Sequence, residues 1–187
     1  MTTIETTLFS YTELSEDAKK LVIQNKIKSA ETDDMFLQYS SDSMMDSLKS
    51  ITESCSLKMV DWCFGSYSRN YCVKVRNDYY EDLEGNRAIA WFLRVLIDNG
   101  YSRPKKFKDM KFNGVCGFTG MGYDEDILET IYGELLNGKT VAKAFDSVGK
   151  KLSDMLYDEY VYLTSEEGIM DHLDEKEEIY TEDGEEY

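Results

Sequence analysis

Acidic residues are concentrated at the C-terminal end of this 187-residue chain, and this asymmetry constrains its organisation more than any other feature. Residues 154–187 contain fourteen Asp and Glu residues and a single base, Lys176, which gives a local net charge of −13. The first 153 residues carry 23 acids and 20 bases, a net of −3. A surface this acidic repels phosphate and attracts Lys- and Arg-rich grooves, so it favours a protein partner that itself binds nucleic acid.

The rest of the composition indicates a folded protein with a real core. Hydrophobic residues make up 42% of the chain and aromatic residues 13%, which separates it from acidic disordered proteins. Its length falls in the usual range of one domain. We therefore predict a single domain over residues 1–187 that includes an acidic C-terminal segment, residues 154–187.

Neither a membrane span nor a secretory signal is evident. No apolar run approaches the roughly 18 residues that a membrane-spanning helix needs, and the N-terminal MTTIETTLFS lacks a basic start and an apolar centre. We expect a cytoplasmic protein with no membrane contact.

The cysteines do not indicate a metal site or a redox motif. Cys55, Cys63, Cys72 and Cys116 are far apart and form no CxxC pair, so we expect reduced thiols and neither a bound metal nor a cofactor. A disulfide between Cys63 and Cys72 remains geometrically open if their strands pair.

Periodic patterns predict the regular elements of the N-terminal half. After an extended segment at 6–11, residues 12–30 form an amphipathic pattern with Ser15 as N-cap, and residues 33–54 form a second helix. Residues 56–77 are typical of a β-hairpin, with Gly65 and Asn70 near its turn. These elements are followed by a polar loop at residues 77–86.

The C-terminal half is predicted to be mainly helical. The apolar segment 87–98, ended by Asn99 and Gly100, predicts a helix lying against the sheet. A strand is then expected over residues 112–118, in the second half of the segment 103–122, with Phe112, Val115 and Phe118 as candidate core residues. The three helices that follow span about 124–137, 140–155 with Thr140 as cap, and a short stretch capped by Thr164 or Ser165. The fold class is therefore α+β, a small, mostly antiparallel sheet packed with about five or six helices.

No catalytic constellation is evident. The single histidine, His172, lies among acids and is typical of a surface residue, so we assign no catalytic residue. The Gly-rich segment 114–126 lacks a phosphate-loop motif, and its acids Asp124, Glu125 and Asp126 would repel phosphate. We interpret these acids as helix-capping residues, with a bound divalent cation as the alternative.

A basic run interrupts the acidic chain between residues 103 and 111. It interleaves Phe107 with five bases, as a phosphate-tracking loop would, and the candidate RNA-binding residues are Arg103, Lys105, Lys106, Lys108 and Lys111. The alternative is a solvated loop offset by the acidic end.

The acidic end also has two interpretations. Charge runs commonly keep proteins soluble, but tyrosines stand among these acids, and interfaces favour tyrosine. Ile179 and Tyr180 give the segment side chains with which to pack on the domain. The candidate partner-binding residues are Asp171, Asp174, Glu175, Glu177, Glu178, Tyr180, Glu182 and Asp183, with Tyr180 as the aromatic anchor.

Both ends of the chain resemble those of small phage and prophage proteins. In that family an aromatic strand and ELSxxAK open the chain, as in FSYTELSEDAKKLVI here, and EYxYLTS with a TEDG tail closes it, as in residues 158–187. The segments 61–75 and 117–128 match its middle strands and its Gly-Tyr-Asp-Glu turn, although GSYSRN replaces a QGDG-like turn. Members are generally of unknown function, and some carry antitoxin labels.

By origin, size and charge the chain is also similar to phage counter-defence proteins such as anti-CRISPR inhibitors. Our hypothesis is a phage-encoded inhibitor of a defence nuclease, a Cas9-type effector with its guide RNA, acting in the host bacterial cytoplasm through an acidic surface that competes with nucleic acid. Two alternatives stay open. One is an RNA-directed factor or metal-dependent nuclease that disables the guide RNA, and the other is an antitoxin that neutralises a cognate toxin.

Overall fold

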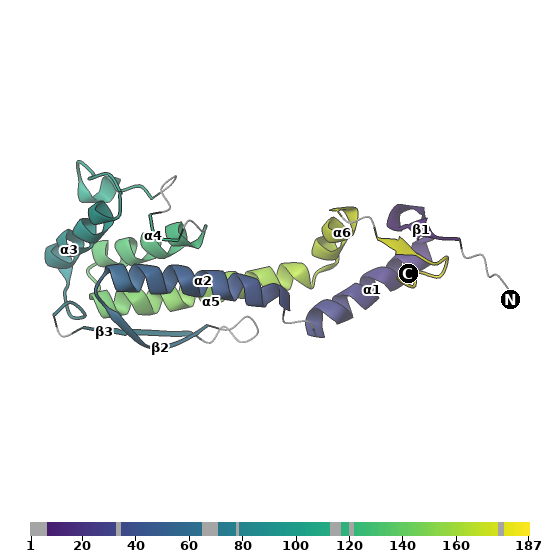
Figure 1. Cartoon of the computed structure of the whole chain (residues 1–187), viewed down its shortest axis with the longest axis horizontal. Coiled ribbons are helices and arrows are strands. Elements are labelled where there is room, and N and C mark those ends of the chain that lie inside the picture. The colour runs from purple at the N-terminus through teal and green to yellow at the C-terminus, as the bar shows by residue number, and fades with distance from the viewer. Residues whose placement is uncertain are drawn as a thin grey trace. The chain divides into compact units, whose positions relative to one another are not determined.

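The computed structural model describes residues 7–32, 35–64, 71–77, 79–112, 117–119, 122–175 and 178–187. Over these residues it contains six α-helices and two antiparallel sheets of two strands each (Figure 1). This arrangement confirms the predicted α+β class. In the same residues, no helix has both the length and the apolar character needed to cross a membrane.

The chain divides into two compact units. The terminal unit combines Met1–Phe36 with Asp158–Tyr187, and the central unit is Leu37–Tyr157. Each unit is described by itself below, and the single domain over residues 1–187 stays a prediction.

The terminal unit is built from the two ends of the sequence. Its N-terminal part contains β1 (Phe9–Ser10), the 3₁₀ turn η1 (Tyr11–Glu13) and α1 (Glu16–Thr32), and its C-terminal part contains α6 (Glu166–Glu175) and β4 (Ile179–Tyr180). β1 pairs antiparallel with β4, so that Phe9 lies opposite Tyr180. The predicted cap is confirmed, because the Ala18 N–H donates to Ser15 Oγ at 3.2 Å.

A small core lies between these elements. It takes residues from α1, from the segment before α1, from α6 and from β4, and partly buried Phe9, Tyr11, Ile27 and Ala30 pack against it. Its buried members are Leu14, Ala18, Val22, Ile23, Ile169, Leu173 and Tyr180. The tail after α6 therefore contributes to the hydrophobic core of this unit.

The central unit contains the hairpin and most of the helices. Its elements are α2 (Met35–Ser54), β2 (Lys58–Phe64), β3 (Tyr71–Arg76), α3 (Gly85–Asp98), η2 (Phe107–Asp109), α4 (Tyr123–Leu136) and the larger part of α5 (Val141–Leu163). The predicted hairpin is confirmed, and Cys63 lies opposite Cys72 with both thiols free. Gly65, Asn70 and Cys116 lie outside the described residues.

Local signals mark the ends of several helices as predicted. Gly100, directly after α3, has a φ of +91°, a conformation that glycine adopts readily. Thr140 Oγ1 accepts the N–H of Lys143 at 3.3 Å at the start of α5. This helix continues to Leu163, beyond the predicted end near Met155, and there Thr164 Oγ1 donates to the Tyr160 carbonyl at 2.8 Å.

The predicted strand over residues 112–118 is wrong for the residues that the structure describes. Residues 110–112 and 117–119 form no strand, and Val115 lies outside the described part of the chain. Phe112 is buried as expected, but it packs edge-on against Tyr101 and Tyr132, with ring centroids 6.1 and 5.7 Å away. Aromatic packing, without a backbone ladder, holds this segment.

A different helix from the predicted one approaches the hairpin closely. The principal partner of α3 is α4, and the rings of Phe92 and Tyr132 lie 6.3 Å apart between them. Gly149 of α5 faces β3 instead, and a Cβ added there would lie 2.9 Å from Val73 Cγ2. The missing side chain at Gly149 is what allows α5 to come this near to the strand.

Candidate functional site

The acidic tail is folded against α1. After α6 the chain forms β4 and turns back, so that the Tyr187 N–H donates to the Ile179 carbonyl at 3.1 Å and Thr181 N–H to the Glu185 carbonyl at 2.9 Å. An isolated antiparallel β-bridge also pairs the backbones of Tyr180 and Glu186. The end of this tail is a short closed turn, and its carboxylates are carried on a defined backbone.

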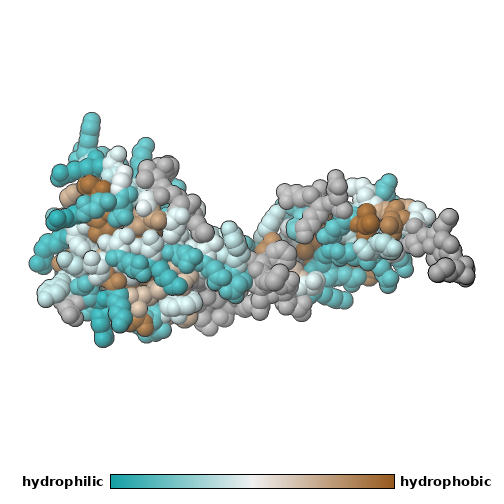
Figure 2. Space-filling model, viewed as in Figure 1, coloured by the Kyte–Doolittle hydropathy of each residue, from teal (hydrophilic) through white to brown (hydrophobic). Residues whose placement is uncertain are grey.

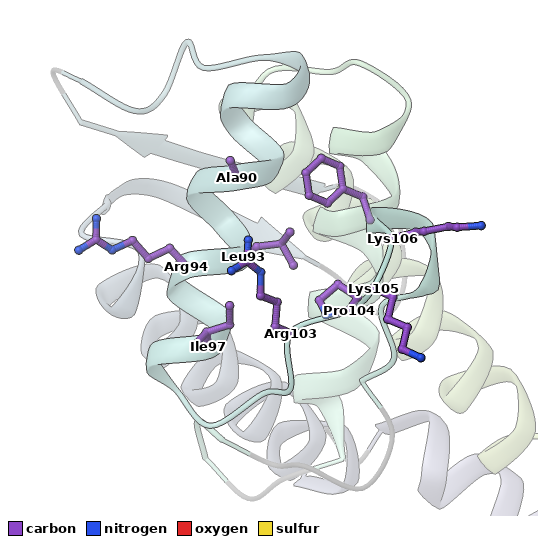
Figure 3. Close-up of a pocket in the computed structure, with 9 residues that line it drawn as sticks. Ala90, Leu93, Arg94, Ile97, Arg103, Pro104, Lys105 and Lys106 are labelled. Atoms are coloured by element: carbon purple, nitrogen blue, oxygen red, sulfur yellow. The ribbon is translucent and has the colours of Figure 1, made fainter.

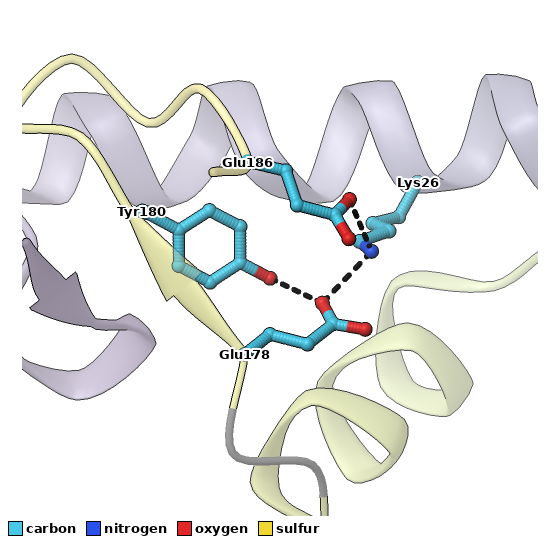
Figure 4. Close-up of polar contacts among 4 residues, drawn as sticks. All are labelled: Lys26, Glu178, Tyr180 and Glu186. Atoms are coloured by element: carbon cyan, nitrogen blue, oxygen red, sulfur yellow. Dashed lines mark hydrogen bonds and ion pairs between the residues drawn. The ribbon is translucent and has the colours of Figure 1, made fainter.

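One lysine of α1 connects the tail to the helix. Lys26 Nζ lies 2.8 Å from Glu178 Oε2 and 2.9 Å from Glu186 Oε2 (Figure 4). Burial works to lower the pKa of Lys26, but hydrogen bonds and charge from Glu178 and Glu186 outweigh it, and the pKa is raised. This single cation offsets the repulsion between two tail carboxylates, and our sequence reasoning missed it because the partners are distant in sequence.

Tyr180 faces the core of the terminal unit. Its side chain is 1% exposed, and its hydroxyl donates to Glu178 Oε2 at 2.6 Å. Burial, followed by the hydrogen bond with Glu178, raises the pKa of Tyr180 above its usual value. The residue that we expected to anchor a partner therefore anchors the tail to its own unit. The tyrosines exposed in this unit include Tyr162 and Tyr187, at 45% and 75%.

The other candidate partner-binding residues are distributed over α6 and the tail. Asp171 is exposed and accepts the Tyr162 hydroxyl at 2.6 Å. Glu182 and Asp183 are exposed in the terminal turn. Asp174 and Glu175 belong to the last turn of α6, but their side chains, like the whole of Glu177, lie outside the described structure.

Charge is divided very unequally between the two units. The terminal unit contains 20 acids and 5 bases, a net of −15, whereas the central unit contains 17 acids and 16 bases, a net of −1. Figure 2 shows hydrophilic side chains over much of the visible face of each unit, with apolar patches among them. Almost the whole net charge of the protein therefore belongs to one small folded unit.

The basic segment lies between α3 and α4 in the central unit. Arg103, Lys105, Lys106, Lys108 and Lys111 are all exposed, and none of them forms an ion pair with a carboxylate in the described residues. Arg103, Lys105 and Lys106 come together on one groove with Arg94 of α3, while Lys108 and Lys111 lie outside it. Arg94 was missed because only tertiary packing brings α3 to this loop.

The acids that begin α4 have structural roles. Asp124 is fully buried and accepts the Thr119 N–H and hydroxyl, both at 2.9 Å. Asp126 lies 3.2 Å from Lys151 Nζ of α5. All three acids lie in the first turn of α4, where negative charge complements the helix dipole as predicted, but neither contact is a cap, and Gly122 at the N-cap makes no side-chain hydrogen bond to a helix N–H. Within the residues that the structure describes, no group of three or more His, Cys, Asp or Glu side chains could hold a metal ion.

Comparisons with protein-family models, with curated proteins and with solved structures gave no match. The resemblance of the two ends to phage and prophage proteins stays a prediction.

Proposed function

We propose that this protein acts by binding, with its terminal unit as an anionic surface that occupies the nucleic-acid-binding face of a protein partner. The observation that supports this proposal is the net charge of −15 on a folded unit beside −1 on the rest of the chain. A positive groove that binds a phosphate backbone is the surface most strongly attracted to such a unit. The first partner to test is a Cas9-type effector, whose guide duplex lies in a positive channel.

Order in the tail strengthens this proposal. Because Lys26, Tyr180 and the β1–β4 pairing hold the tail in place, its carboxylates lose little conformational entropy on binding. A flexible acidic tail would lose more of its freedom and would bind less tightly for the same charge. Exposed Tyr162 and Tyr187 supply flat contact area near these carboxylates.

The experiment is a binding and cleavage assay with charge-neutralised variants of the full chain. The test variant replaces three exposed acids of the terminal unit, E167Q, E182Q and E185Q. The matched control neutralises three exposed acids of the central unit, E53Q, D82N and E84Q. An ion pair between one exposed acid and the partner contributes about 0.2–1 kcal/mol. Loss of three such pairs should therefore weaken binding of the test variant roughly tenfold.

The expected result is co-elution of the protein with the nuclease, inhibition of DNA cleavage, and loss of both in the test variant only. Equal inhibition by test and control variants would reject an acidic mimic. Guide RNA incubated with the protein and Mg²⁺ should remain intact, whereas its degradation would favour the RNA-directed alternative. Substitution is the proper test here, because deleting the tail would remove Tyr180 from the core as well as the charge.

A further inference from the structure

A groove lies between α3 and the segment 103–107 of the central unit. Its lining is basic and apolar, in contrast to the acidic surface of the terminal unit. It has a volume of about 580 Å³, within the range of roughly 300–1,000 Å³ typical of small-molecule sites. Five of its residues are apolar and four are basic (Figure 3), namely Ala90, Leu93, Ile97, Pro104 and Phe107, and Arg94, Arg103, Lys105 and Lys106. No acid lines it.

The wall formed by residues 103–107 is fixed by packing on both sides. Tyr101 before it and Phe112 after it are 3% and 4% exposed. Within the segment, the Tyr132 hydroxyl donates to the Phe107 carbonyl at 2.7 Å, so the backbone of Phe107 is tied to α4. The Phe107 side chain nevertheless remains 43% exposed. The groove therefore presents an aromatic ring on a backbone that is already in position.

The cations of the groove are available to a ligand. Arg94, Arg103, Lys105 and Lys106 are exposed and form no ion pair within the described structure. In Figure 3, Arg103 lies between the loop and α3, while Lys105 and Lys106 extend outward from the loop. A ligand would thus meet one cation over the apolar floor and others along the rim.

We propose that this groove binds single-stranded nucleic acid, with an unstacked base against Phe107 and the neighbouring apolar floor and with phosphates on the four cations. A lone inorganic anion would use the charges but leave the exposed ring and Ile97 uncovered. Exposed aromatic rings beside a basic track are the combination that single strands require, since stacking and phosphate contacts supply most of their affinity. This proposal is independent of the role of the terminal unit.

The test measures binding of a fluorescein-labelled oligo(U) RNA, roughly eight nucleotides long, to the full chain by fluorescence anisotropy over a range of salt concentrations. F107A removes the ring but keeps the carbonyl that Tyr132 binds, and K105Q/K106Q removes two rim charges. K108Q/K111Q is the matched control, because it removes the same charge from the same segment outside the groove.

We expect F107A to weaken binding roughly tenfold with an unchanged slope of log affinity against log salt. K105Q/K106Q should reduce that slope by about 1.4, since each contact to a single strand contributes about 0.7. R94Q, on α3, should reduce it by about 0.7 and serves as a second variant on an independent element. The control pair should leave both quantities unchanged.

Three results would overturn the proposal. They are absence of binding by the unsubstituted chain at low salt, equal losses in the groove pair and the control pair, and displacement of the RNA by a polyglutamate peptide at equal concentration. The last result would indicate an acidic protein segment as the occupant. Thermal melting of each variant shows whether a loss of binding reflects unfolding.

Discussion

We expect Tyr180→Ala to unfold the terminal unit while the central unit stays folded. Tyr180 is 1% exposed and is one of seven buried residues in the core cluster of its unit. Truncation of a buried aromatic residue to alanine costs about 3–5 kcal/mol. Whole domains are stable by only about 5–15 kcal/mol, and a unit with so small a core falls at the lower end. The loss therefore removes most of the stability of this unit.

A conservative substitution separates packing from hydrogen bonding. Tyr180→Phe keeps the ring and removes the hydroxyl that donates to Glu178 Oε2 at 2.6 Å. Because Lys26 still binds the same carboxylate oxygen, Glu178 keeps a partner, and we expect a loss of about 1–1.5 kcal/mol. Tyr187→Ala, at a side chain that is 75% exposed, should change stability by less than about 0.5 kcal/mol.

Amide hydrogen exchange followed by mass spectrometry is the appropriate assay, since it reports on each unit separately. Peptides from α1 should lose protection in Tyr180→Ala and keep it in Tyr187→Ala, and peptides from α4 should be unchanged in both. Full protection of α1 in Tyr180→Ala would refute the assignment of Tyr180 to the core of this unit.

Three further predictions concern packing, pH and thiol reactivity. Gly149→Ala should destabilise the central unit by about 1–3 kcal/mol in urea denaturation. The control Gly133→Ala, with nothing within 4 Å of its new Cβ, should stabilise this unit by about 0.5–1 kcal/mol. Equal effects of the two substitutions on stability would contradict the close approach of α5 to β3. Because the pKa of Lys26 is raised above the usual 10.5, its contribution to the stability of the terminal unit is fully present below that pH and is lost as the pH rises through the folded value. Circular dichroism melts should record that decline, and a constant melting temperature there would argue against the ion pairs. Iodoacetamide should alkylate exposed Cys63 before Cys55, since burial raises the pKa of the Cys55 thiol to about 12, and peptide mass spectrometry gives the order.

Local signals in the sequence were sufficient for most helices. Ser15 and Thr140 are capping residues recognisable from type and position alone, and both accept a backbone N–H as predicted. The two-residue strands β1 and β4 could not be predicted as a pair, because such short segments carry no periodicity and their partners lie at opposite ends of the chain. Phe112 was correctly placed in the core but in the wrong kind of structure, since burial does not distinguish a strand from a packed loop.

The candidate sites were predicted in composition but not in geometry. The acidic end and the basic segment are visible as charge runs. Which face Tyr180 presents, and which bases share a groove with Arg94, depend on contacts between distant segments.

The construction of the terminal unit from both ends of the sequence has a consequence for its biosynthesis. During translation α1 leaves the ribosome before the central unit, but β4 with Tyr180 follows only after it, a delay of about 7–30 s at about 5–20 residues per second. Until then Leu14, just before α1, and the apolar face of α1 that includes Ala18 and Val22 have no native cover. We expect a nascent chain in this interval to be a substrate for ribosome-associated chaperones, since its exposed apolar side chains favour aggregation.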